Sequence, residues 1–164
     1  MEAIAIAPKG RILVVDDQRN MRATTAMLLR AEGYEVDEAG GGEEALAMLS
    51  ARPVELLVTD LKMEPIDGLT LLKRALEVAP AAQVIVMTAY GSIESAVEAM
   101  RRGAYDYITK PFDIDVLTLG VEKALNERGL RREVARLRRE VARRRIRANT
   151  SCIGCALPMM FSKR

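Results

Sequence analysis

Short apolar runs recur along the first two thirds of the chain and are separated by segments with a different periodicity. Three of these runs are apolar at almost every position, which is typical of parallel strands covered on both faces. We therefore predict five strands, at RILVV (11–15), YEVDEA (34–39), VELLVTD (54–60), QVIVMTA (83–89) and YDYIT (105–109).

The segments between the runs repeat apolar residues every three or four positions, as amphipathic helices do. Strict alternation of strands and helices predicts an α/β fold, in which a parallel sheet with right-handed crossovers carries helices on both faces. The residues that mark the five helices are Met21, Met27 and Leu28; Ala45, Leu46 and Leu49; Leu69, Leu72, Ala75 and Leu76; Ile93, Ala96, Val97 and Met100; and Val116, Leu117, Val121, Ala124 and Leu125.

A helical pattern continues beyond the fifth expected helix, in a segment of opposite charge. Its apolar residues Leu130, Val134, Leu137 and Val141 are spaced by 4, 3 and 4 positions, as in a coiled coil. Residues 128–164 carry a net charge of +10, so the chain's total of +2 leaves −8 for residues 1–127.

Pattern and charge together divide the chain into four parts. We expect an N-terminal tail at 1–10, a folded domain at 11–127 and a basic coiled-coil linker helix at 128–147. The remaining residues, 148–164, are expected to be disordered or to begin a truncated further domain.

Composition excludes several kinds of chemistry and location. The chain has no histidine, so His-based nucleophilic catalysis and His metal ligands are ruled out. No run approaches the roughly 18 apolar residues of a membrane span, and the opening MEAIAIAPKG lacks the features of a signal peptide. We therefore expect a cytoplasmic protein whose chemistry depends on carboxylates, hydroxyls and lysine.

Polar residues that can bind a ligand or take part in a reaction follow the expected strands. Because ligands of doubly wound sheets bind beyond the carboxyl ends of the strands, these residues should gather at one edge. Three carboxylates held close together call for a hard cation such as Mg²⁺, and a lysine and a hydroxyl suit the oxygens of a phosphoryl group. The residues are Asp16 and Asp17, Asp60, Thr88 and Lys110.

Taken together, these motifs resemble the receiver domains of two-component response regulators over residues 11 to about 127. The resemblance rests on Asp16-Asp17, Asp60 in TDLKMEPIDGL, Thr88 in MTAYGS, and YDYITKPFD. It implies a flavodoxin-like (βα)5 fold with strand order 2-1-3-4-5. One departure is Glu64-Pro65 in place of the family's usual Met-Pro order, which leaves open whether Glu64 competes for the metal.

The resemblance also implies a role for each site residue. Asp60 would accept a phosphoryl group, with Thr88 and Lys110 contacting it. Mg²⁺ would be held by Asp16, Asp17, Asp60 and the backbone carbonyl of Lys62. Tyr107 would act with Thr88 as a conformational switch, and the peptide between Lys110 and Pro111 would be cis.

The segment from MTAYGS to TKPFD is most similar to the nitrogen-regulatory branch of response regulators, which activates sigma-54-dependent transcription. The resemblance implies a sensor histidine kinase as phosphoryl donor and a homodimer through the linker helix and the face of the fourth helix, fifth strand and fifth helix. An AAA+ ATPase and a DNA-binding domain would follow in a longer parent chain, and residues 148–164 could begin that ATPase. No GxxxxGK(S/T) motif occurs, so we expect no ATPase and no enzyme beyond self-phosphorylation and slow dephosphorylation.

Two other functions remain open from the residues alone. The ten arginines of residues 128–147 could bind nucleic acid, although no base-reading module accompanies them and we expect no direct binding. An aspartate nucleophile with Mg²⁺ could also serve a small phosphatase, although no general acid or substrate pocket is recognisable.

Overall fold

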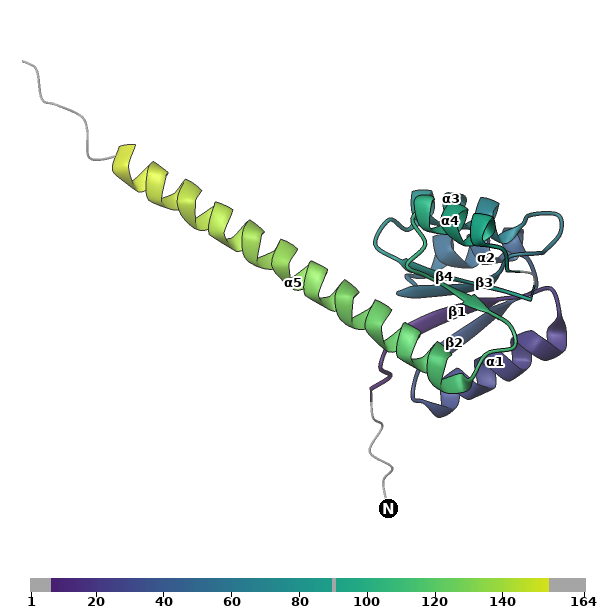
Figure 1. The fold of residues 1–164 in the computed structure, drawn as a ribbon. Helices are drawn as coiled ribbons and strands as arrows, with labels where there is room; N and C mark the ends of the chain where they lie inside the picture. Colours follow the sequence, from purple (N-terminus) through teal and green to yellow (C-terminus); the bar gives the residue numbers. More distant parts are fainter. Residues whose placement is uncertain (1–6, 90, 154–164) are drawn as a thin grey trace, which may run out of the picture. The chain divides into compact units, whose positions relative to one another are not determined.

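The computed structural model describes residues 7–89 and 91–153, including side chains as far as residue 150 (Figure 1). Five parallel strands form one sheet in the order β2-β1-β3-β4-β5, which confirms the predicted fold class. The elements are β1 Arg11–Val15, α1 Arg19–Ala31, β2 Glu35–Ala39, α2 Gly42–Ala51, β3 Leu56–Asp60, α3 Gly68–Val78, β4 Gln83–Thr88, α4 Ile93–Arg101, β5 Asp106–Thr109 and α5 Ile114–Ile153.

The sheet is buried on both faces because alternate residues of its central strands enter two separate cores. Leu13 and Leu57 belong to the core that also includes α2 and α3 residues, whereas Ile12 and Leu56 belong to the core with α1 and α5 residues. All of β3 and nearly all of β1 and β4 are buried. The continuous apolar runs in the sequence therefore have the physical origin that we inferred from them.

Helix α5 extends further than the sequence predicted. We expected the linker helix to end at residue 147, but the helix continues to Ile153. Its first turns contribute Leu117, Val121 and Ala124 to one core of the sheet. The chain divides into two compact units, one ending at Arg128 and the other beginning at Gly129.

The ends of the chain are only partly covered by the structure. Residues 1–6 of the expected N-terminal tail and 154–164 of the expected C-terminal tail lie outside the described residues. Within the part that is described, no helix is both long enough and apolar enough to cross a membrane.

Candidate functional site

The two acidic residues after β1 differ sharply in exposure. Asp16 is only 1% exposed, and its Oδ1 accepts a hydrogen bond of 2.9 Å from the backbone N–H of Gln18, directly before α1. Arg22 from α1 donates to the Asp16 carbonyl oxygen at 2.8 Å. Asp17 is exposed. Asp16 is thus fixed by its surroundings, while Asp17 faces solvent at the same strand end.

Asp60 ends β3, the central strand of the sheet, and is 8% exposed. Its Oδ1 accepts a hydrogen bond of 2.9 Å from the N–H of Leu61. One carboxylate oxygen from each of Asp16, Asp17 and Asp60 can be chosen so that all three lie within 4.8 Å of one another. The sheet topology therefore brings together three carboxylates that the sequence places at the ends of two different strands, β1 and β3.

Lys110 reaches into this cluster from the end of β5. Its Nζ lies 2.9 Å from Oδ2 of Asp16 and 3.6 Å from Oδ1 of Asp60. The backbone N–H of Lys110 donates to the Thr88 carbonyl at 2.7 Å, which holds the loop against β4. The peptide between Lys110 and Pro111 is cis, as the resemblance implied.

Burial sets the protonation behaviour of Asp60. Removal from water is the largest influence and raises the pKa of Asp60 above its ordinary value. The Lys110 ammonium and the Leu61 N–H lower this pKa, and the charges of Asp16 and Asp17 raise it. The net effect is upward, so the ionised carboxylate is disfavoured by its surroundings in the metal-free protein.

This raised pKa predicts a stability effect of fixed sign. When a carboxyl group has a raised pKa in the folded state, the free energy of unfolding falls as the pH rises from the ordinary pKa of the group to its raised pKa. We expect Asp60→Asn to increase the melting temperature at pH 7 in EDTA, because the amide carries no charge to desolvate. The increase should vanish near pH 3, where the parent carboxyl is protonated; an increase of equal size at both pH values would contradict this origin.

A pocket of about 540 Å³ opens beside Asp60 and holds the remaining residues of the predicted constellation. Thr88, fully buried at the end of β4, lines it together with Asp60 and Lys110. The other lining residues are Gln18, Met21, Lys62, Ala89 and Pro111. The carboxylate, hydroxyl and ammonium groups therefore share one accessible space.

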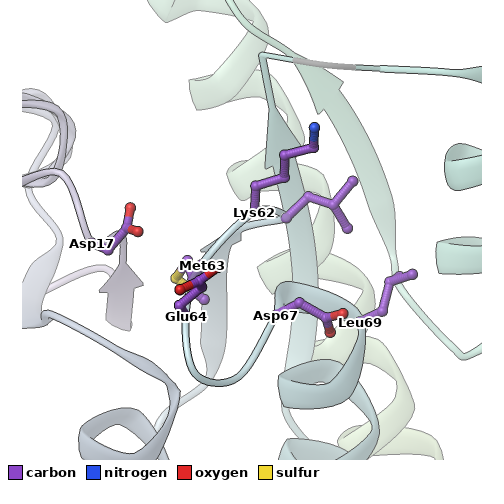
Figure 2. A pocket seen from close by; sticks show the side chains of 7 residues that line it. Asp17, Lys62, Met63, Glu64, Asp67 and Leu69 are labelled. Atoms are coloured by element: carbon purple, nitrogen blue, oxygen red, sulfur yellow. The ribbon is translucent and has the colours of Figure 1, made fainter.

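A second pocket, of about 600 Å³, lies between Asp17 and the loop after β3 (Figure 2). Figure 2 shows Asp17 on one side and Glu64 on the loop across from it. Glu64 is exposed and precedes a second cis proline, Pro65. In the part of the chain that the structure covers, Glu64 does not belong to the group of three close carboxylates.

Gly68, the first residue of α3, supports the acceptor strand in a way that we did not anticipate. Its N–H donates to the Leu61 carbonyl at 2.7 Å. A Cβ on Gly68 would lie 2.8 Å from the Cα of Leu61 and would also collide with the Asp60 carbonyl oxygen. The absence of a side chain at this position lets α3 begin directly against the end of β3.

We expect Gly68→Ala to lower the free energy of unfolding by about 1–3 kcal/mol, because backbone atoms must move to admit the methyl group. Labelling of Asp60 by acetyl phosphate should slow as well, since the displaced backbone is that of Asp60. Gly41→Ala is the control, because nothing lies within 4 Å of a Cβ there. Equal stability of the two variants in urea titrations would show that the close approach is unimportant.

Comparison with known proteins identifies the group of proteins to which this site belongs. The sequence pattern of the response regulator receiver domain matches residues 12–122. The chain belongs to the response regulator receiver domain family. The resemblance noted in the sequence is thereby confirmed.

Several relatives of this receiver domain are much longer proteins. Regulatory protein AtoC of Escherichia coli K12 is 38% identical over 128 residues, which are 78% of this chain and 28% of that protein. Transcriptional regulatory protein ZraR of Escherichia coli O157:H7 is 44% identical over 70% of this chain and 26% of that protein. The chain thus spans little more than a quarter of the length of these relatives.

Solved structures agree with the receiver fold. NtrX from Brucella abortus, crystallised with ADP, matches with a TM-score of 0.75 and 41% identity over 78% of this chain and 30% of that one. The beryllofluoride-activated NtrC4 receiver domain dimer matches with a TM-score of 0.69 and 33% identity over 72% of this chain and 98% of that one. Similarity to NtrX and NtrC4 confirms the nitrogen-regulatory type of receiver.

Tyr107, on β5 of the receiver domain, is partly buried and contacts a residue that sequence reasoning missed. Its hydroxyl lies 2.8 Å from Oγ of Ser95 on α4. Ser95 and Ser92 also form the capping box at the start of α4. The spacing of two serines before an apolar helical stripe was the available signal for the cap, but no sequence signal connects Ser95 to Tyr107.

Proposed function

We propose that this receiver domain is a phosphorylation-dependent switch in which Asp60 accepts a phosphoryl group from the phosphohistidine of a sensor kinase. The observation that carries the proposal is the convergence of three carboxylates within 4.8 Å beside the Lys110 ammonium. No histidine occurs in the chain, so the phosphohistidine belongs to another protein.

The acidic cluster fits a divalent cation. Asp16, Asp17 and Asp60 offer hard oxygen ligands. The pKa of Asp60 is raised by burial first and by the charges of Asp16 and Asp17 second, and a bound cation would offset both effects. We propose that Mg²⁺ is held by these carboxylates and the backbone carbonyl of Lys62. When bound, Mg²⁺ supplies positive charge that shields the phosphoryl oxygens from the carboxylates.

In the proposed transfer, an Oδ atom of Asp60 forms a bond to phosphorus while the bond from phosphorus to the histidine nitrogen breaks. The nitrogen keeps the electron pair, and the product on Asp60 is an acyl phosphate. Lys110 stabilises the charge on the transferred group, and the Thr88 hydroxyl donates a hydrogen bond to it. Their shared pocket beside Asp60 supports these roles.

We propose that the added charge draws Thr88 toward Asp60 and that Tyr107 then moves into the space beside β4. That movement would break the hydrogen bond between Tyr107 and Ser95 and so disturb the first turn of α4. α4 also exposes Ile93, Val97 and Met100. We propose that this apolar face, with β5 and the adjoining part of α5, pairs with a second copy.

The longer relatives support a wider assignment. We propose that the parent protein carries an AAA+ ATPase and a DNA-binding domain after this receiver and regulates sigma-54-dependent transcription. Under this proposal the chain is a regulatory module and not an enzyme that turns over a separate substrate.

Stoichiometry tests the proposed function against a small phosphatase. Incubation with acetyl phosphate and Mg²⁺ should label each chain with one phosphoryl group, followed by slow release of inorganic phosphate. The same protein should not hydrolyse p-nitrophenyl phosphate with multiple turnovers. Fast repeated turnover of that ester, without accumulation of a labelled chain, would favour the phosphatase.

A further inference from the structure

The peptide bond between Asp16 and Asp17 is held by a residue outside the acidic cluster. This peptide joins two of the three residues whose carboxylates converge. Its carbonyl oxygen, that of Asp16, accepts a hydrogen bond of 2.8 Å from Nη1 of Arg22. Because a peptide unit is planar, fixing this carbonyl also fixes the direction in which the chain enters Asp17.

Asp17 depends on such support more than the other two carboxylates do. Both carboxylate oxygens of Asp16 are held, one by the Gln18 N–H and one by Lys110. Asp60 ends a strand that is buried throughout. Asp17 is exposed and lies in the irregular segment between β1 and α1. Its position is therefore set mainly by its backbone.

The guanidinium of Arg22 is itself held by the end of β2. Its Nε lies 3.7 Å from Oε1 of Glu38, whose second carboxylate oxygen accepts a hydrogen bond of 3.2 Å from Arg30. A Cβ on Gly40 would lie 3.3 Å from Nη1 of Arg22, so this glycine leaves room for the guanidinium. Residues of β2 and of the turn after it thus direct Arg22 toward the Asp16 carbonyl.

Arg22 is not paired as completely as an arginine that serves the fold alone would be. Its side chain is only 19% exposed. The Nε is buried and makes no hydrogen bond with any residue that the structure describes. An unpaired buried N–H lowers stability. The best contact of Arg22 is therefore its hydrogen bond to the Asp16 carbonyl.

We propose that Arg22 is a positioning residue for the divalent cation, because its hydrogen bond to the Asp16 carbonyl fixes the peptide that orients Asp17. The inference rests on the Mg²⁺ site of the proposed function and adds a residue that touches neither the cation nor the phosphoryl group. Groups that orient metal ligands from behind commonly contribute about tenfold to a hundredfold to metal affinity.

The sign of the effect separates positioning from charge. Arg22 is a cation next to the acidic cluster, so its charge alone repels Mg²⁺, and loss of that charge would tighten metal binding. Loss of a purely structural contact would lower the melting temperature in EDTA and leave the Mg²⁺ affinity of the folded protein unchanged. Only a positioning role predicts that a folded Arg22 variant binds Mg²⁺ more weakly.

Thermal melting of the full chain over a series of Mg²⁺ concentrations gives the dissociation constant without any phosphorylation. Arg22→Met removes the donor and keeps an unbranched side chain, and should weaken Mg²⁺ binding about tenfold. Arg19→Met removes the same charge from an exposed position on α1 and is the matched control, with an affinity equal to that of the parent or slightly tighter. Parent affinity or tighter binding in Arg22→Met would overturn the proposal.

Arg22→Lys decides the question if Arg22→Met does not fold. Lysine keeps the charge but lacks the planar guanidinium that reaches both the Asp16 carbonyl and Glu38. We expect its Mg²⁺ affinity to fall by a smaller factor, of about threefold. Since the charge is unchanged, weaker binding would support positioning, and parent affinity would overturn it.

Acetyl phosphate labelling distinguishes positioning from a direct part in the chemistry. In Arg22→Met the Mg²⁺ concentration for half-maximal labelling should rise about tenfold. The rate at saturating Mg²⁺ should fall much less, because Asp60, Thr88 and Lys110 are intact. A lower saturated rate with an unchanged Mg²⁺ requirement would overturn the positioning role.

The parent chain separates failure of this inference from failure of the proposed function. A parent whose melting temperature does not respond to Mg²⁺ would overturn the metal site and the role of Arg22 with it. A parent that binds Mg²⁺ and is labelled, with an Arg22→Met variant of equal affinity, would overturn only the role of Arg22.

Discussion

Lys110→Met should slow the labelling of Asp60 by acetyl phosphate about hundredfold or more at saturating Mg²⁺. The Lys110 side chain is almost completely buried, and its Nζ lies 2.9 Å from Oδ2 of Asp16 and 3.6 Å from Oδ1 of Asp60. Solvent therefore cannot supply an equivalent positive charge at this position when the ammonium is removed. The rate is measured by intact mass at timed intervals. Lys73→Met, an exposed lysine on α3, is the matched control and should label at the parent rate.

The same substitution should also lower stability in EDTA, because it leaves the buried Asp16 carboxylate without its ion-pair partner. Rates are therefore compared at a temperature where circular dichroism shows both proteins to be folded. A folded Lys110→Met variant that labels as fast as the parent would remove Lys110 from the proposed chemistry.

Asp17→Asn should weaken Mg²⁺ binding at least about tenfold, because the cation loses one of the few carboxylates that hold it. Asp17 is exposed, so its substitution should leave the fold intact. In EDTA the variant should melt at a higher temperature than the parent, since one of three mutually repelling charges is gone. Both effects can be followed by thermal melting at a series of Mg²⁺ concentrations.

Glu64→Gln provides the control for Asp17→Asn, because Glu64 lines the same pocket without joining the close group of carboxylates. We expect its Mg²⁺ dependence to match that of the parent. If Glu64→Gln weakened the metal response as much as Asp17→Asn, the cation would lie further toward the loop after β3 than the proposed ligand set allows.

The strands and the convergence of the site residues could be predicted because both follow from simple rules. Runs such as those of β1 and β3 are apolar throughout, and few arrangements other than a doubly covered parallel sheet accommodate them. Such a sheet brings its strand ends to one edge, so Asp16, Asp60 and Lys110 had to come near one another. The distances in the structure agree with that expectation.

Other features depend on contacts between elements that a linear pattern does not encode. Position 68 requires glycine because α3 begins against the backbone of Asp60 and Leu61. Ser95 contacts Tyr107 because β5 places the Tyr107 hydroxyl beside α4. The end of α5 was misjudged because residues after 147 lose the apolar spacing, yet the helix propagates through them to Ile153. Local periodicity therefore identifies elements well and their mutual contacts poorly.

The convergence of Asp16, Asp17 and Asp60 beside Lys110 supports one central claim, that Asp60 becomes an acyl phosphate. Intact-mass spectrometry after incubation with acetyl phosphate and Mg²⁺ tests it most directly. The parent chain should gain one adduct of roughly 80 Da, and Asp60→Asn and the EDTA-treated parent should gain none. An adduct of the same size on Asp60→Asn, or its absence from the folded parent with Mg²⁺, would contradict the account.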